Sequence, residues 1–363
     1  MSKPISFSII GGSSFRAGYY LRIARELPER FKAAGMVVRD VQKAAALEEK
    51  WGVAAYPNVN ELLKKEQPDF IVISVSASVC AGYLLQLADL GIPVLTETPP
   101  GSSLPELRML YKKLNVKKAK VQVAEQYHLH PTNVARLAVI NSGMLGEVTE
   151  ATISISHLYH GASLMRKMLG LHFENAEIRA MRFHSPLTAG PNRSGKPEEE
   201  RVISAERDLA WVSFGSKLGI YDFTKDQHRS WIRSNHLSVR GTKGELFDDR
   251  LVFLQHFDCP MSVDLKRINK GEQENAEGYF LEGITAGERW VYQNPFAPAR
   301  LYDDEIAIAS CLGKMADYIS GGQGFYSFAE AAQDFYLGSM IEKAIATGET
   351  IQTERQPWAE EEQ

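Results

Sequence analysis

Short apolar segments alternate with helix-like segments through the first 124 residues, and this alternation constrains the fold more than any other feature of the chain. Strand-like runs lie at residues 5–10, 36–38, 70–75, 94–95 and 121–124. Helix-like stretches lie between them at residues 18–31, 41–51, 59–66, 79–90 and 104–114. Strands that alternate with helices predict a parallel sheet with helices on both faces. Right-handed crossovers make such a sheet doubly wound.

The pattern changes after about residue 125. Strand-like runs follow one another with few helices between them at residues 147–156, 209–214, 218–223, 231–239 and 251–254. Two helices are expected near the end of the chain, at residues 304–319 and 328–347. We therefore expect a first α/β domain, with a doubly wound parallel sheet, over residues 1–124. A second α/β domain with a mixed or antiparallel sheet is expected over residues 125–363.

Two irregular segments are expected in the second domain. Residues 190–200 are rich in Pro, Gly, Lys and Glu and predict a mobile loop. The acidic end of the chain, from Trp358 onward, predicts a frayed tail.

Composition excludes several classes of protein. A chain of 363 residues with a net charge of -4 lacks the basic surface of a nucleic-acid binder. Apolar runs stay shorter than the roughly 18 residues that a membrane span needs. The N-terminus enters a strand at once, without the pattern of a signal peptide. Three widely spaced cysteines fit neither a disulfide framework nor a zinc site, so we expect a cytoplasmic protein.

A glycine turn after the first strand is the first candidate binding feature. Ligands of parallel sheets bind at the carboxyl ends of the strands. This rule gathers residues 11–16, 38–40, 75–77 and 97–99 around one crevice. The G-x-G-x-x-G pattern of dinucleotide-binding turns is incomplete, because its second and third glycines fall on Ser13 and Arg16. A serine can still donate its hydroxyl to a phosphate, but the alternative is a tight turn that binds no nucleotide.

The residue after the second strand bears on the choice of cofactor. An acidic residue there normally holds the ribose hydroxyls, and that place falls on Val38. Arg39 follows and could pair with a 2′-phosphate or stack on adenine. The alternative is an exposed arginine at the end of a strand. The expected cofactor-binding residues are Gly11, Gly12, Ser13, Ser14, Phe15, Arg16, Arg39, Val75, Ser76, Glu97 and Thr98.

Several segments resemble the Gfo/Idh/MocA oxidoreductases, the relatives of glucose–fructose oxidoreductase and inositol dehydrogenase. Glu97-Thr98-Pro99, preceded by residues 91–95, resembles the family's Glu-Lys-Pro segment. Residues 68–73, 142–147, 240–246 and 328–348 are similar to other family segments and occur in the family's order. His160 stands ten residues before Gly170, a spacing similar to that of the family's catalytic histidine. Together these segments cover nearly the whole chain.

The resemblance implies a fold, a cofactor and a substrate class. It implies a Rossmann domain, a C-terminal α/β domain with a large open sheet, NAD or NADP, and a sugar, polyol or related small hydroxy compound. It also implies assembly into homodimers or homotetramers through that sheet.

Departures from the family pattern mostly remove charge from the crevice. The family's lysine is Thr98 in this chain, and two of its aspartates are Ser156 and Ser163. His128 stands where the family has an arginine, and Cys80 where it has a loop histidine.

Oxidation of an alcohol needs a base for the hydroxyl proton. Histidine titrates near working pH, so His160 is the candidate base, with His157 three residues before it. The alternative for each is a packed core histidine. The spacing of these two histidines would allow a metal, but no third ligand is evident and no metal is expected. Cys80 lacks a base and is expected to be an apolar helix residue. The expected substrate-binding residues are Gln126, Tyr127, His128, Tyr159 and Arg166.

Three functional hypotheses follow. The first is an NAD(P)-dependent oxidoreductase with a rearranged acid/base set. The second is a non-catalytic relative that binds a dinucleotide or another ligand, which the missing lysine at Thr98 favours. The third is a glycosidase or lyase that uses bound NAD⁺ transiently. The retained His160 favours the first or the third.

Overall fold

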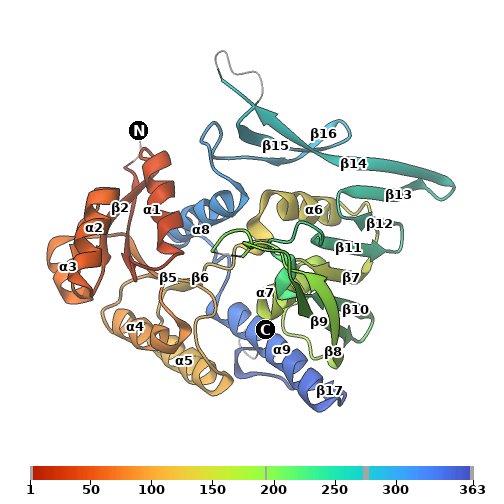
Figure 1. The fold of residues 1–363 in the computed structure, drawn as a ribbon, viewed down its shortest axis with the longest axis horizontal. Helices are drawn as coiled ribbons and strands as arrows, with labels where there is room; N and C mark the ends of the chain where they lie inside the picture. Colours follow the sequence, from red (N-terminus) through yellow and green to blue (C-terminus); the bar gives the residue numbers. More distant parts are fainter. Residues whose placement is uncertain (1–2, 193, 273–277, 360–363) are drawn as a thin grey trace. The chain divides into compact units, whose positions relative to one another are not determined.

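The computed structural model describes residues 3–192, 194–272 and 278–359 of the chain (Figure 1). These residues form two compact units. Of the described residues, the first unit contains those within 1–131, 267–283 and 293–332, and the second contains those within 132–266, 284–292 and 333–363. The first unit therefore extends beyond residues 1–124, since it takes in two later segments.

A parallel sheet of six strands forms the centre of the first unit. Its strands are β1 (Ile5–Ile10), β2 (Phe31–Val37), β3 (Ala55–Tyr56), β4 (Phe70–Ile73), β5 (Val94–Thr96) and β6 (Val121–Val123). The strand order is β3-β2-β1-β4-β5-β6, and every neighbouring pair is parallel. This is the doubly wound Rossmann topology that the sequence predicted.

Helices connect these strands: α1 (Ala17–Glu26), α2 (Val41–Trp51), α3 (Val59–Lys65), α4 (Ala77–Asp89) and α5 (Leu104–Val116). Figure 1 shows α1 on one side of the sheet and α4 and α5 on the other. All four residues of β4 are buried, because a central parallel strand is covered on both faces. The chain order changes direction between β1 and β4, which marks the switch point where such sheets bind ligands.

The expected helix over residues 18–31 is too long. Helix α1 ends at Glu26, and Phe31 begins β2, so the second strand starts five residues before the expected Met36. Pro28 explains the difference, because proline disfavours a helical conformation in the residue before it and has no backbone N–H to continue the ladder.

A large sheet of eleven strands dominates the rest of the chain. Its strands are β7 (Val148–Ser154), β8 (Glu177–Thr188), β9 (Val202–Phe214), β10 (Lys217–Phe223), β11 (His236–Gly241), β12 (Gly244–Phe247), β13 (Arg250–His256), β14 (Cys259–Lys270), β15 (Phe280–Ala286), β16 (Arg289–Gln293) and β17 (Ile351–Gln352). The order is β16-β15-β14-β13-β12-β11-β7-β10-β9-β8-β17. Antiparallel pairs predominate, whereas β7 and β10 pair in parallel. This confirms the prediction of a mixed or antiparallel sheet.

The remaining helices are η1 (Tyr127–Leu129), α6 (Pro131–Asn141), α7 (Leu158–Leu169), η2 (Lys225–Gln227), α8 (Asp303–Ile319), α9 (Phe328–Thr347) and η3 (Pro357–Ala359). Among the described residues, no helix has the length and apolar character that a membrane crossing needs.

The expectation that a frayed tail begins at Trp358 is wrong for Trp358 itself. The Trp358 side chain is buried, and its Nε1 donates a hydrogen bond of 2.8 Å to Oε1 of Gln333. A large aromatic ring with a satisfied N–H anchors this part of the chain. Residues 360–363 lie outside the described residues.

Candidate cofactor and catalytic sites

The turn from β1 to α1 is built around glycines. Gly11 has a φ of +90°, and a Cβ atom there would lie 2.3 Å from the backbone oxygen of Ser74. Only glycine tolerates both the conformation and the close approach. Gly12 is needed for packing, since a Cβ there would lie 2.9 Å from the Cβ of Met36 on β2. The turn thus brings bare backbone to the switch point of the sheet.

Two serines lie in the turn, and Ser13 stands at the position of the pattern's second glycine. The Ser14 hydroxyl lies 2.7 Å from the Ser74 hydroxyl and accepts a hydrogen bond of 3.0 Å from the backbone N of Ala17. Ser14 thereby links β4 to the first turn of α1. The Ser13 side chain lines the adjacent pocket. The N-terminus of α1 supplies the partial positive charge that favours a phosphate there.

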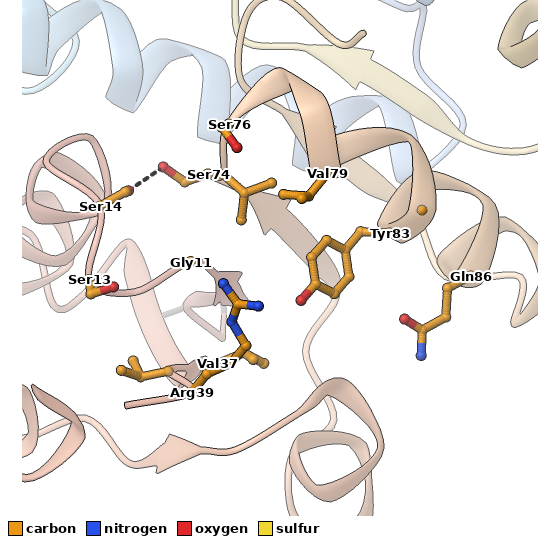
Figure 2. Close-up of a pocket in the computed structure, with 13 residues that line it drawn as sticks. Gly11, Ser13, Ser14, Val37, Arg39, Ser74, Ser76, Val79, Tyr83 and Gln86 are labelled. Atoms are coloured by element: carbon orange, nitrogen blue, oxygen red, sulfur yellow. Dashed lines mark hydrogen bonds between the residues drawn. The ribbon is translucent and has the colours of Figure 1, made fainter. Parts of the chain in front are cut away.

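A pocket of about 610 Å³ opens beside this turn (Figure 2). It is large enough for half of a dinucleotide or more. The lining residues are Gly11, Ser13, Ser14, Val37, Val38, Arg39, Ser74, Val75, Ser76, Val79, Gly82, Tyr83 and Gln86. The predicted residues Gly11, Ser13, Ser14, Arg39, Val75 and Ser76 therefore come together, and no carboxylate is among the described lining residues.

Figure 2 shows the side chains of Arg39 and Tyr83 pointing into the pocket from opposite walls, with Gln86 farther out on the same helix as Tyr83. Sequence reasoning missed the α4 residues. Their signal was the spacing of Val79, Tyr83 and Gln86, since residues three and four apart share one face of a helix. A bare glycine turn, a helix N-terminus and a pocket without carboxylates among its described lining residues fit the phosphate groups of a dinucleotide.

Five other residues expected to bind cofactor lie in the first unit but do not line this pocket. Phe15 is exposed and packs edge-on against Tyr19, with the ring centroids 5.5 Å apart. Nε of Arg16 donates to Oε2 of Glu97 at 3.3 Å. Glu97 and Thr98 follow the end of β5. Gly12, the fifth such residue, is held against β2.

A buried carboxyl group that sequence reasoning missed follows β6. Glu125 is fully buried and accepts a hydrogen bond of 3.1 Å from the backbone N of Tyr127. Burial raises the pKa of Glu125 to about 8. The neighbouring Gln126 amide, in the orientation that satisfies both of its contacts, donates to the backbone oxygen of Ala124 at 2.9 Å and accepts from Arg16 at 3.2 Å. In the sequence, the signal that could have identified Glu125 is an acidic residue shortly after an apolar strand.

Tyr127 and His128, both expected to contact substrate, lie in η1. The Tyr127 ring stacks on His130 with a centroid distance of 5.2 Å. His128 is buried against the ring of Tyr326 at 5.1 Å.

The predicted histidine pair lies in the second unit at the start of α7. His157 is the N-cap residue, and its ring centroid lies 5.0 Å from that of His160, in an edge-to-face arrangement. His160 is buried, whereas His157 is exposed. The Tyr159 ring lies 4.4 Å from the His160 ring. One helix terminus therefore gathers both candidate acid/base groups and one expected substrate residue.

Arg166 lies on the same helix, but deep in the second unit. It is 1% exposed, and its Nη1 donates to Oδ1 of Asp334 at 2.6 Å. Its Nε donates to the backbone oxygen of His172 at 2.7 Å. These contacts favour a role in fixing α7 over direct contact with a substrate.

Cys80 is a buried residue of α4, as expected, and lies 3.2 Å from the hydroxyl of Thr96. Burial raises the pKa of the Cys80 thiol to about 11, which disfavours the reactive thiolate. Among the described residues, no group of three or more His, Cys, Asp or Glu side chains is arranged to hold a metal ion.

Comparison with known proteins gives one family match. Residues 5–125 match the model of an oxidoreductase family described as having an NAD-binding Rossmann fold, the Gfo/Idh/MocA family. No curated protein sequence matches the chain. The predicted family resemblance and the NAD-binding Rossmann domain are thus confirmed for this segment.

Solved structures resemble the chain over nearly its full length. An oxidoreductase from Agrobacterium radiobacter, in complex with NAD⁺, L-tartaric acid and magnesium, has a TM-score of 0.69 at 16% identity, covering 96% of this chain and 98% of its own. A myo-inositol dehydrogenase from Corynebacterium glutamicum has a TM-score of 0.65 at 16% identity, covering 97% and 99%. The WlbA dehydrogenase from Bordetella pertussis, in complex with NADH and UDP-GlcNAcA, has a TM-score of 0.64 at 13% identity, covering 97% and 99%. At these identities the similarity shows a shared fold.

Proposed function

Starting from a chain whose residues 5–125 carry the NAD-binding Rossmann fold of the Gfo/Idh/MocA oxidoreductases, we propose that the protein is an NAD(P)-dependent oxidoreductase acting on a CH–OH group. The observation that carries the proposal is the 610 Å³ pocket, in which the glycine turn between β1 and α1 and the side chain of Arg39 face the same space. The substrate class that we propose is a sugar, a polyol or a related small hydroxy compound.

The pocket residues would hold the cofactor in a defined orientation. Gly11 and Ser13 would approach the pyrophosphate, while Arg39 and Tyr83 would flank the adenosine end. A carboxylate in place of Val38 would repel a 2′-phosphate, and its absence together with Arg39 favours NADP over NAD. When bound, the dinucleotide supplies the hydride acceptor or donor.

His160 is proposed as the acid/base residue, helped by His157. The family's lysine is replaced by Thr98, which can form a hydrogen bond but cannot supply a positive charge. The imidazole of His160 can accept the proton of the substrate hydroxyl as hydride leaves the carbon that carries this hydroxyl. The ring of His157 lies against His160 and can orient it or pass the proton toward solvent.

Assembly into a homodimer or homotetramer through the large sheet belongs to the same proposal. Apolar side chains are exposed along its strands, namely Met181, Phe183, Trp211, Val252 and Leu254. An exposed set of large apolar residues on one sheet is typical of a protein–protein interface.

The test is a screen of sugars, polyols and their phosphates that follows nicotinamide absorbance. With an active substrate, His160→Ala should lower kcat about 10²–10⁴-fold, because general-base catalysis contributes that factor. His157→Ala should cost less, and neither change should alter the Kd for the dinucleotide. The matched control is His172→Ala, since His172 lies beyond the C-terminal end of α7, whereas the pair lies at its N-terminal end. Wild-type turnover by His160→Ala would refute the assignment.

The outcome also separates the other two hypotheses. Dinucleotide binding without turnover of any alcohol would favour the non-catalytic relative. Release of a leaving group with no net change in nicotinamide absorbance would favour the glycosidase or lyase.

A further inference from the structure

A second cavity, of about 220 Å³, lies in the second unit on the large sheet, and the proposed oxidoreductase chemistry makes no use of it. Strands β7, β9, β10 and β11 and the loop that joins β10 to β11 contribute the polar residues on which the argument rests. The residues that matter are Ser154, Arg207, Asp222, Thr224, Arg233 and His236.

Sheet geometry places this cavity on the face away from α7. The Tyr221 hydroxyl accepts a hydrogen bond of 2.9 Å from the backbone N of Leu158, so Tyr221 points toward α7. Its neighbour Asp222 points to the opposite face, because side chains alternate along a strand. Ser154 stands opposite His236 in the register of β7 and β11 and lies on that same face. The cavity is thus separated from the histidine pair by the sheet itself.

Positive charge exceeds negative charge around the cavity. Arg207 donates from Nε and Nη2 to the two carboxylate oxygens of Asp222, at 2.6 and 2.5 Å. Nε2 of His236 lies 3.7 Å from the same carboxylate. Arg233 donates from Nη1 to the backbone oxygen of Ile232, and within the described part of the chain it forms no ion pair. With Asp222 balanced by Arg207, the charge of Arg233 remains for a ligand.

An unsatisfied hydroxyl also faces the cavity. Thr224 lines it and is 8% exposed, yet its Oγ1 has no hydrogen-bond partner among the described residues. A buried hydroxyl without a partner is unfavourable, and such a group calls for a ligand or an ordered water. Thr224 and Arg233 thus point independently to a polar, negatively charged occupant.

We propose that this cavity binds a small oxyanion, the carboxylate or phosphate group of a small hydroxylated molecule. Arg233 and the outer edge of Arg207 supply N–H donors, and Thr224 and Ser154 supply hydroxyls. A volume of 220 Å³ corresponds to about seven water molecules at ~30 Å³ each, which suits an anion of a few heavy atoms and excludes a dinucleotide.

The loop between β10 and β11 connects this cavity to the histidine pair. Nε2 of Gln227 donates to the backbone oxygen of Ser154 at 2.7 Å, which fixes η2 to the sheet. The next residue, His228, places its ring 6.1 Å from the ring of His157. An occupant held by Thr224 and Arg233 would stabilise this loop and, if the proposed function holds, the orientation of His157.

Calorimetric titration of the full chain at constant ionic strength tests the site, with sodium phosphate and sodium glycolate as probes. We expect one bound anion per chain. Arg233→Gln and Thr224→Val should each raise its Kd about tenfold, as expected when one charged or hydroxyl partner is lost. Arg229→Gln, in the same loop but outside the cavity lining, is the control and should leave Kd unchanged.

Phosphate could also enter the dinucleotide pocket, so the titration is repeated with Arg39→Ser, which should not change the Kd of this site. NADP binding should stay the same in Arg233→Gln and Thr224→Val, so failure here is distinguishable from failure of the proposed function. Absence of binding by either probe at 10 mM, or an equal Kd in Arg233→Gln and Arg229→Gln, would overturn the proposal.

Discussion

The phenolic hydroxyl of Tyr20 donates a hydrogen bond of 2.6 Å to Oε1 of Glu97 inside the first unit. Tyr20 is fully buried, and burial together with the nearby Glu97 charge raises the pKa of its phenol well above the usual value. Arg16 holds the other carboxylate oxygen. Glu97 therefore ties α1 to the end of β5, which makes it a structural acceptor more than a free base.

Removing the Tyr20 hydroxyl should destabilise the protein. Tyr20→Phe leaves one oxygen of a nearly buried carboxylate without its donor, which should cost about 1–3 kcal/mol of unfolding free energy. Urea unfolding measures the change. Tyr83→Phe is the matched control, because the Tyr83 hydroxyl opens into a pocket, and it should cost under about 0.5 kcal/mol. Equal losses in the two variants would contradict the role of the Tyr20–Glu97 bond.

Glu125 should make stability depend on pH. Its folded pKa is about 8, against 4.5 for an ordinary Glu, so the neutral form is favoured in the folded state. The stability that this group contributes is complete below about pH 4.5 and is lost as pH rises through 8. Glu125→Gln should therefore lose less unfolding free energy than the wild type between pH 5 and 8.5, by on the order of 2–4 kcal/mol.

Urea unfolding at four pH values across that range checks this expectation. Glu29→Gln, at an exposed position, is the control and should keep the wild-type slope. Parallel slopes for Glu125→Gln and the wild type would show that Glu125 is ionised in the folded protein.

Arg39 should set the choice between the two nicotinamide cofactors. Arg39→Ser removes the cation at the end of β2, so the Kd for NADP should rise about tenfold while the Kd for NAD changes less than about twofold. Calorimetry with both cofactors measures the two constants. Arg25→Ser, on the neighbouring α1 and outside the pocket lining, is the control. A clear NAD preference in the wild type would refute the argument from Arg39.

Sequence periodicity predicted the first unit well, because buried parallel strands are short apolar runs bounded by glycine or proline. Gly52 ends α2 in the left-handed conformation, as a C-terminal glycine predicts. The strand β8 was missed because its side chains are mostly exposed and mixed in polarity, so it lacks a clear alternation. The strand expected over residues 231–239 starts too early, because β11 begins at His236.

The sequence could predict which residues lie together where they follow the ends of parallel strands. Gly11 and Arg39 follow strand ends, and the parallel topology brings strand ends together. The roles of Arg166 and Glu97 depend on partners far away in sequence, Asp334 and Tyr20, that only the folded chain reveals. Tyr83 could not be predicted as a pocket residue, because its position depends on how α4 is oriented relative to the glycine turn.

Calorimetric titration of the purified protein with NADP⁺ and NAD⁺ tests the central claim most directly, with a variant that fills the pocket. Gly82 lies on α4 in the pocket lining, and a Cβ there meets no atom within 4 Å, so Gly82→Trp should fold and block the adenosine end. Gly313→Trp, at a helical glycine with the same free space outside the pocket, is the control. We predict micromolar binding by the wild type and the control, and a Kd at least tenfold higher for Gly82→Trp. No binding of either cofactor by the wild type, or an unchanged Kd in Gly82→Trp, would contradict the account.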